Sequence, residues 1–441
     1  MNDGEIIRAR LFHTPTNPFR TEHALQSYED GALLIRDGRI AACDDYRTVR
    51  RSSPNATCTE WPGSVVLPGL VDAHVHFPQV RIVGHLGRSL LDWLQHVALP
   101  EEARLADTRY AAAVAGEFVR SLARSGTTTA LVFGAHFPAA TASLFEAASA
   151  AGLRVTAGLC LSDRLLRDDL LQSAADAYRD STMLIDRYHR RGRLRYAVTP
   201  RFALSTSEAM LDVCQSLADE HRDVRIQTHI NEHPDEIADV ARAFPWARDY
   251  LAVYERYGLV GPRTVMAHNV SPQRSEIERL ATSGTSIAHC PCSNAALGSG
   301  IFSLRPHITA GVRCALGTDV GGGIGFGVLK EALQAYLMQR VATEPMTLDA
   351  AQLLYLATRA GAEALELERE VGDFTVGKAA DLVVIRPPDG SAFAAALAHA
   401  DRPDQALAAV FTGAHEDSIC EVRVDGCVVH RLRGPSPVAP D

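Results

Sequence analysis

Lysine is almost absent from this chain. Only Lys330 and Lys378 occur among its 44 basic residues, and the others are arginine. The sequence also lacks a block of clustered basic residues, and its formal net charge is −9. Nucleic acids bind to clustered positive charge, so a nucleic-acid partner is not expected.

Long apolar runs and paired cysteines are missing as well. No stretch approaches the roughly 20 apolar residues that span a bilayer, and residues 1–20 lack the apolar core of a signal peptide. The nine cysteines are an odd number spread over the chain, which favours reduced thiols over a disulfide framework. These features predict a cytoplasmic protein without a membrane partner.

The length of 441 residues, with 46% hydrophobic and 22% charged residues, excludes a small stapled scaffold and an entirely disordered chain. Strand-like segments at both ends predict one β domain shared by the termini. Residues 31–38 and 39–43 meet at an Asp-Gly turn, as in a β-hairpin, and residues 380–385 and 421–430 have the same character. The predicted division is two halves of a β-sandwich at 1–67 and 376–441, with a barrel at 68–375 between them.

Repeated β-α units are predicted for the central region, where short apolar runs alternate with longer helical stretches. The eight predicted strands are Ser64–His76, Thr127–Gly134, Arg154–Leu161, Leu194–Phe202, Val224–Ile230, Thr264–Val270, Ser286–Cys292 and Val312–Val320. Their number alone fits either a closed (β/α)8 barrel or an open doubly wound sheet. Unusual polar residues gather near the C-terminal strand ends, where barrel enzymes carry their chemistry, and this favours the barrel. These residues are His74, His76, Arg201, His229, His268, His289 and Asp319.

A metal site is predicted from three of these strand ends. His74 and His76 are two residues apart, so they point to the same face of a strand. This pair alone fits two hydrogen-bonded histidines as well as two ligands. His229 and Asp319 end two further strands, and three imidazoles with one carboxylate form a typical zinc or ferrous coordination shell.

Residues 68–76, Pro-Gly-Leu-Val-Asp-Ala-His-Val-His, resemble the opening signature of the amidohydrolase superfamily. His229, His268 and Asp319 follow in the order of its other landmarks, and the resemblance covers essentially the whole chain. It implies a metal-dependent hydrolase with a (β/α)8 barrel and a β-sandwich. The chain has no lysine between His76 and Lys330, which excludes the two-metal sites bridged by a carboxylated lysine. We therefore expect one Zn²⁺ per chain, with Fe²⁺ or Mn²⁺ as alternatives.

A narrower resemblance is to the guanine deaminase family. Glu232 lies three residues after His229, as in the superfamily's mononuclear deaminases. Further segments are similar in the same order: His76–Gln79, Leu90–Leu94, Gly126–Gly134, Thr199–Ala203, His289–Asn294, Leu297–Gly300 and Leu316–Val320. The resemblance implies hydrolysis of guanine to xanthine and ammonia in purine catabolism, and a homodimer.

The resemblance also assigns contacts with the substrate. It implies that Gln79 and Arg201 hydrogen-bond the purine and that Phe202 packs on the ring. A neutral amide and a fixed guanidinium suit the donors and acceptors of guanine. The full set of implied substrate contacts is Gln79, Trp93, Arg201, Phe202, His229 and Glu232.

The hypothesis for catalysis divides the work among three side chains. A metal lowers the pKa of bound water from about 15.7 toward about 7. Asp319 would accept the water's proton, His268 would hold the attacking oxygen, and Glu232 would protonate the ring nitrogen beside the amino-bearing carbon. Zinc nucleobase deaminases of another fold divide the work in the same way, between water on the metal and a glutamate that is not a ligand.

Several other residues have a simpler interpretation. Cys290 and Cys292, expected inside the seventh strand, are interpreted as buried structural cysteines because the ligand set is complete without them. The glycine spacing in Gly321–Gly327 resembles a dinucleotide fingerprint, but it lacks the matching acidic residue and is interpreted as a loop beside Asp319. His289 is interpreted as a structural or supporting residue. Surface or turn positions are expected for most of the remaining candidates, which are His85, His96, His136, His233 and His307.

The sequence departs from the guanine deaminase pattern at Asn269 and in the loop at Gly322, Gly323 and Ile324. The loop departure leaves open a related aminohydrolase acting on a pterin, a triazine or another aminopurine. A non-catalytic barrel that serves as an interaction protein is the other alternative. Such proteins typically lose ligands, whereas this chain has all four.

Overall fold

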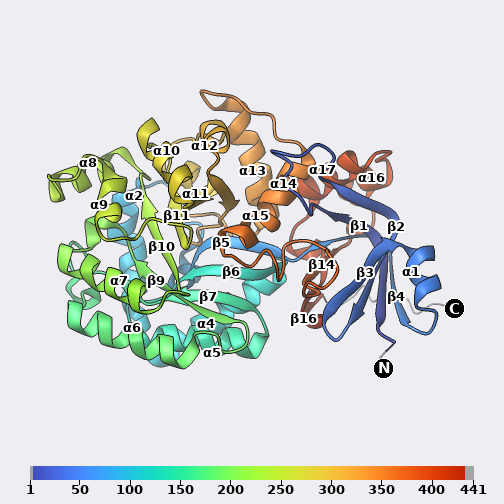
Figure 1. The fold of residues 1–441 in the computed structure, drawn as a ribbon, viewed down its shortest axis with the longest axis horizontal. Coiled ribbons are helices and arrows are strands. Elements are labelled where there is room, and N and C mark those ends of the chain that lie inside the picture. Colours follow the sequence, from blue (N-terminus) through green and yellow to red (C-terminus); the bar gives the residue numbers. More distant parts are fainter. Residues whose placement is uncertain (1–2, 433–441) are drawn as a thin grey trace.

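A parallel barrel and a separate sheet built from both termini make up the protein in a computed structural model that describes residues 3–432 (Figure 1). Eight parallel strands pair in the order β5-β6-β7-β9-β10-β11-β12-β13, and the two-residue β8 pairs with β9. The barrel strands are β5 (Leu70–His76), β6 (Thr127–Phe133), β7 (Arg154–Gly158), β8 (Cys160–Leu161), β9 (Leu194–Pro200), β10 (Arg225–Ile230), β11 (Thr264–His268), β12 (Ser286–His289) and β13 (Arg313–Leu316). The predicted barrel is confirmed.

The barrel closes through the residues that follow β13. The Asp319 N–H donates to the His74 carbonyl at 2.9 Å, and the His76 N–H donates to the Val320 carbonyl at 3.1 Å. Gly317 permits this approach, because a Cβ there would lie 2.7 Å from the His74 Cβ. The closure thus places Asp319 directly against the strand that carries both histidines.

Helices surround the barrel and bury their apolar faces on it. In α4 (Thr108–Arg124) the Asp107 side chain caps the first turn, and the buried residues recur at helical spacing, including Val114, Phe118 and Leu122. The other helices after β5 are α2 (Leu90–Trp93), α3 (Leu99–Ala103), α5 (Pro138–Ala151), α6 (Ala174–Tyr188), α7 (Glu208–Glu220), α8 (Pro234–Ala243), α9 (Tyr250–Arg256), α10 (Arg274–Ser283), α11 (Pro291–Ala296), α12 (Leu304–Ala310), α13 (Val328–Val341), α14 (Ala350–Ala357) and α15 (Arg359–Ala364).

The termini share one seven-stranded sheet in the order β16-β15-β14-β4-β1-β2-β3. The strands of this sheet are β1 (Glu5–His13), β2 (Gln26–Arg36), β3 (Arg39–Asp45), β4 (Thr57–Pro68), β14 (Leu382–Ile385), β15 (Ile419–Val424) and β16 (Cys427–Arg431). The helices in the same terminal segments are α1 (Tyr46–Ser52), α16 (Ala392–Ala398) and α17 (Pro403–Gly413). The predicted hairpin of residues 31–43 is confirmed, and the strand-like residues 421–430 form a second hairpin, with positive φ at Asp37, Gly38, Asp425 and Gly426. The sheet curls on itself, since the Ala380 N–H donates to the Gly38 carbonyl at 2.8 Å.

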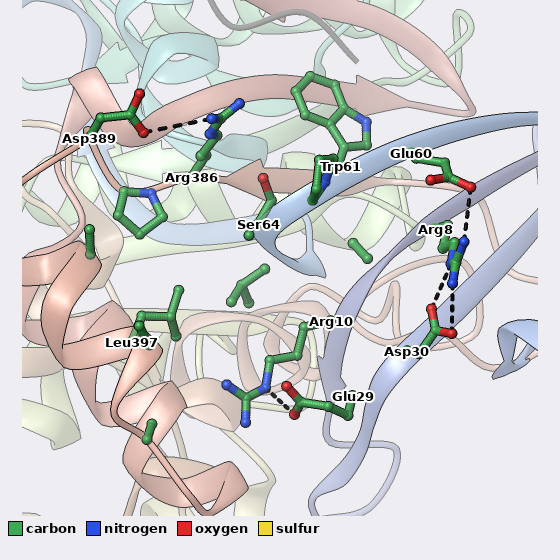
Figure 2. A pocket seen from close by; sticks show the side chains of 18 residues that line it. Arg8, Arg10, Glu29, Asp30, Glu60, Trp61, Ser64, Arg386, Asp389 and Leu397 are labelled. Atoms are coloured by element: carbon green, nitrogen blue, oxygen red, sulfur yellow. Dashed lines mark hydrogen bonds and ion pairs between the residues drawn. The ribbon is translucent and has the colours of Figure 1, made fainter. Parts of the chain in front are cut away.

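Figure 2 shows a pocket between this sheet and α16, and none of the histidines at the barrel strand ends lines it. Its charged side chains are paired among themselves. Arg8 bonds Asp30 and Glu60, and Arg10 lies 2.6 Å from Glu29. Arg386 lies 3.7 Å from Asp389. Each charged side chain of the lining therefore has a partner of opposite sign, and the four carboxylates outnumber the three arginines by one.

All eight barrel strands are shorter than predicted, and the first and the seventh are examples. The first divides at Pro68, where β4 of the terminal sheet ends, and β5 begins at Leu70. The seventh ends at His289, so the expectation that Cys290 and Cys292 lie inside it was wrong. Pro291 instead opens α11, because the first turn of a helix tolerates the missing N–H.

Among residues 3–432, every helix is too short or too polar to cross a membrane.

Candidate active site

Four side chains predicted as metal ligands converge at the C-terminal ends of the barrel strands. His76 Nε2 lies 3.3 Å from His74 Nε2 and 3.1 Å from His229 Nε2. Asp319 Oδ1 lies 3.2 Å from His74 Nε2 and 3.3 Å from His76 Nε2. All four residues are buried, and their donor atoms lie within 4.8 Å of one another.

This spacing fits a single cation. Ligands 2.0–2.1 Å from a tetrahedral zinc ion are about 3.3 Å apart, close to the separations seen here. The unprotonated His229 Nε2 and the Asp319 carboxylate are acceptors only, so their convergence calls for positive charge between them. The donor set therefore fits a divalent transition metal.

The imidazoles of His76 and His229 are held in the form that binds metals. Burial lowers the pKa of His76 to about 3, and burial with the neighbouring His74 and His76 holds the pKa of His229 well below its usual range. The His229 Nδ1–H donates to the Arg201 carbonyl at 2.6 Å, which leaves Nε2 directed at the cluster. Burial alone would raise the pKa of Asp319, but its hydrogen bond and attraction to His74 hold that pKa well below the ordinary value.

A second group of side chains faces the same point. His268 Nε2 lies 3.4 Å from Glu232 Oε2 and 3.8 Å from Asp319 Oδ2. The His268 Nδ1–H donates to Asn294 Oδ1 at 2.9 Å, so Nε2 is the unprotonated nitrogen of the ring. Burial lowers the pKa of His268 to about 4. These three predicted catalytic residues are thus brought together by three different strand ends.

Glu232 is a buried carboxyl whose surroundings favour the protonated form. Burial raises its pKa well above the ordinary value, and the nearby Asp319 and Glu236 raise it further. Its Oε1 is buried without a hydrogen-bond partner among the residues that the structure describes. Glu236 Oε2 accepts from the Glu232 N–H at 3.0 Å and fixes the backbone at this position. An unsatisfied buried acid beside a metal-type cluster is suited to proton transfer.

One cavity joins these groups to the predicted substrate contacts. Apolar side chains from the segment after β5 and polar side chains from the strand ends both line it. Its lining consists of His76, Gln79, Leu90, Leu91, Trp93, Leu94, Arg201, Phe202, His229, Glu232, His268, Leu297 and Asp319. Every predicted site residue except His74 lines this cavity, and His74 lies beside it in the metal-type cluster.

Sequence reasoning missed the residue that joins Gln79 to Arg201. Glu102, in α3, accepts from Gln79 Nε2 at 2.8 Å and from the Arg201 guanidinium at 2.6 and 3.0 Å. Its second oxygen lies 3.1 Å from His136 Nε2. The local signal was misleading, because an acidic residue near the start of a helix normally faces solvent and interacts with the helix dipole.

Two histidines expected at surface or turn positions are buried. His136 is 3% exposed beside Glu102, and His307 is fully buried with Nε2 2.9 Å from Asn269 Nδ2. That expectation was wrong for both, because His136 contacts the buried Glu102 and His307 packs against Phe302 with ring centres 4.4 Å apart. His289 is also buried and stacks on Phe302 with ring centres 4.6 Å apart. The buried positions of Cys290 and Cys292 agree with the structural interpretation, although Cys290 Sγ lies within reach of His74 and His268.

Known proteins provide an independent comparison. Residues 65–429 match the model of the amidohydrolase family. A probable guanine deaminase of Deinococcus radiodurans is 53% identical over 431 residues, which cover 96% of this chain and 98% of the relative. The solved guanine deaminase of Escherichia coli superposes with a TM-score of 0.94 at 36% identity, covering 98% of this chain and 100% of the other. The guanine deaminase of C. acetobutylicum, solved with bound guanine, gives 0.89 at 25% identity and covers 97% of this chain and 100% of the other.

Proposed function

The chain belongs to the amidohydrolase family and to its guanine deaminases, and we propose on this basis that it hydrolyses guanine to xanthine and ammonia. One observation carries the proposal. The unsatisfied acid Glu232 faces the same cavity as the metal-type cluster and as two hydrogen-bond donors, Gln79 and Arg201. A cavity with these three elements can position an amino-substituted ring, protonate it and expose it to activated water.

We propose zinc as the metal, held by His74, His76, His229 and Asp319, with iron or manganese as alternatives that the same ligands accept. When bound, the metal supplies an acidified water molecule as the nucleophile. Around that water, Asp319 accepts its first proton through Oδ2, the oxygen turned toward His268. His268 Nε2 accepts a hydrogen bond from the attacking oxygen.

Glu232 moves the protons between water and substrate. Its protonated carboxyl donates to the ring nitrogen beside the amino-bearing carbon, which makes that carbon electrophilic. Glu232 then returns to its acid form by accepting the proton held at Asp319, and the departing amine takes up the proton that the added hydroxyl group loses as the new carbonyl forms. The two protons of water end on the ring nitrogen and on ammonia, so the reaction balances without another reactant.

The remaining cavity residues orient the ring. Arg201 and Gln79 direct N–H groups at acceptors on the purine edge. Phe202 packs against the ring, and Trp93 with the leucines of 90–94 encloses it and excludes water. The test is ammonia release from guanine by the zinc-loaded protein, with adenine, cytosine, ammeline and a pterin under the same conditions. If the protein releases ammonia from another of these compounds but not from guanine, the proposed substrate is wrong and the proposed deamination chemistry stands.

Arg201→Ala is expected to raise the KM for guanine about 10- to 100-fold, since hydrogen bonds from charged groups contribute roughly 1.5–3 kcal/mol. It should also lower the melting temperature, because the buried carboxylate of Glu102 loses its ion-pair partner. Steady-state kinetics and thermal unfolding measure the two effects. Arg225→Ala is the matched control, because Arg225 is a buried arginine paired with Glu366 at the start of β10, the opposite barrel end. An unchanged KM in Arg201→Ala, or an equal rise in the control, would contradict the assignment.

We further propose a homodimer and a cytoplasmic location with a role in purine catabolism, which the likeness to guanine deaminases supports. Sedimentation of the purified protein at several concentrations tests the dimer.

A further inference from the structure

The Glu102 carboxylate is a saturated acceptor that contacts two residues of the substrate cavity, Gln79 and Arg201. It is 2% exposed and interacts with three side chains, two of which line the cavity. Oε1 accepts from Gln79 Nε2 at 2.8 Å and from Arg201 Nη2 at 3.0 Å. Oε2 accepts from Arg201 Nη1 at 2.6 Å and lies 3.1 Å from His136 Nε2. The bidentate pair with Arg201 keeps the plane of the guanidinium fixed.

These contacts set which way the Gln79 amide points. Its Oε1 accepts from the Gly321 N–H at 2.9 Å, while one Nε2 proton goes to Glu102. The second Nε2 proton and the unused guanidinium protons of Arg201 are then the groups left to contact a ligand in the cavity. A flipped amide would place its NH2 group against the Gly321 N–H and its oxygen against the Glu102 carboxylate, so both present hydrogen bonds would be lost.

We infer that Glu102 is a positioning residue that makes this edge of the cavity a donor-only surface and thereby selects purines with a carbonyl oxygen at position 6 over those with an amino group. This inference rests on the proposed function. A carbonyl oxygen at position 6 accepts hydrogen bonds from Gln79 and Arg201. An amino group at position 6 instead turns its own N–H groups toward the N–H groups of these two side chains. Donors left unpaired in a buried site are costly, so the discrimination is large.

The loop after Asp319 takes part in the same arrangement. Gly321 supplies the N–H that holds the Gln79 oxygen, and a Cβ at Gly321 would lie 2.7 Å from the Gln79 carbonyl oxygen. The departure of this loop from the family pattern at Gly322 and Gly323 therefore begins one residue after its contact with Gln79. The Glu102 carboxylate and the Gly321 N–H thus hold the nitrogen and the oxygen of the same Gln79 amide group.

Glu102→Gln tests the inference because glutamine has the same shape as glutamate. It replaces one carboxylate oxygen with an NH2 group, which then faces the donors whose hydrogen bonds Glu102 now accepts. The Gln79 amide is then expected to flip, so that its oxygen accepts from the new NH2 group at residue 102 and also takes the place of the Nε2 proton that faced the cavity. The measured quantity is the ratio of kcat/KM for guanine to that for 2,6-diaminopurine, which carries the same 2-amino group and differs at position 6. We expect a large ratio in the wild type and one about 10- to 100-fold smaller in Glu102→Gln, through a higher KM for guanine.

Glu101→Gln is the matched control. Glu101 is the neighbouring buried glutamate in α3, and its partners are Arg104 and Tyr110 rather than cavity residues. Its variant should keep the wild-type ratio. If Glu102→Gln lowers the activity on both purines equally, Glu102 supports the fold alone and the inference is wrong, while the proposed function stands. If the wild type releases no ammonia from guanine, the proposed function fails instead.

A measurement on the wild type guards against a variant that does not fold. The donor-only edge predicts that hypoxanthine competes with guanine and that adenine competes at least tenfold more weakly. Equal inhibition by the two purines would overturn the inference without any variant. Glu102→Asp, which keeps the charge but shortens the reach, should give a ratio between those of the wild type and Glu102→Gln.

Discussion

Glu232→Gln is expected to lower kcat for guanine by about 10²- to 10⁴-fold, the usual contribution of a positioned acid–base group, with the metal content unchanged. An amide has the same shape as the acid but delivers no proton to the ring nitrogen. Glu232 Oε1 is unpaired among the described residues, so the substitution breaks no hydrogen bond at that atom. The measurements are single-turnover rates of ammonia release and metal analysis of the same samples.

The control for this variant is Glu331→Gln. Glu331 is also a buried carboxyl, and burial raises its pKa to about 8, but it accepts from the Cys292 N–H and does not line the cavity. Its amide can keep that hydrogen bond, so near wild-type turnover is expected. Rapid turnover by Glu232→Gln would show that another group carries the proton, and lost metal would show that Glu232 contributes to the metal site.

Much of the barrel and the metal cluster could be predicted because both depend on local order. Apolar runs mark the strands, and parallel strands place their C-terminal ends at one rim. His74 and His76 share a face by the two-residue period of a strand, and His229 and Asp319 follow from the same rule. The exact strand ends depend on neighbours, as at Pro291, where a helix begins before the apolar run is complete.

The support around the substrate contacts could not be predicted in the same way. Glu102 and Arg201 are 99 residues apart, and Glu102 belongs to a five-residue helix whose sequence resembles an exposed helix start. Only the tertiary fold shows that its carboxylate is buried and that His136 lies beside it. A buried ion pair leaves no periodic pattern in the sequence, because each partner alone resembles an ordinary surface charge.

Removal of the metal is expected to abolish activity and to lower thermal stability. When no cation lies between them, the lone pairs of the His229 imidazole and the Asp319 carboxylate both crowd His76 Nε2, at 3.1 and 3.3 Å, and this arrangement is unfavourable. A metal that binds only the folded chain stabilises it by about 4 kcal/mol at a free concentration 1,000-fold above its Kd. Chelation followed by dialysis should thus give an inactive protein that melts several degrees lower. Zinc, iron and manganese added separately then show which ion restores both properties.

Two variants separate the metal site from its surroundings. His76→Asn should lose the bound metal, because His76 Nε2 contacts three other members of the cluster. His289→Asn should retain it, since His289 is a buried histidine of the neighbouring region whose ring nitrogens have no hydrogen-bond partner among the described residues. Full activity of a sample with less than a tenth of an equivalent of metal would contradict the metal-dependent proposal.

The stoichiometry of restoration also tests the role of Glu232. Glu232, His268 and Asp319 form a second group of possible ligands on the opposite side of the Asp319 carboxylate. Ligands must be deprotonated, and burial together with Asp319 keeps Glu232 in its acid form. One equivalent of metal per chain should therefore restore full activity. A second equivalent of metal should bind only by displacing the proton that Glu232 delivers to the substrate. Activity that rises to a maximum at one equivalent and falls at two would assign the metal to the histidine cluster and the proton to Glu232.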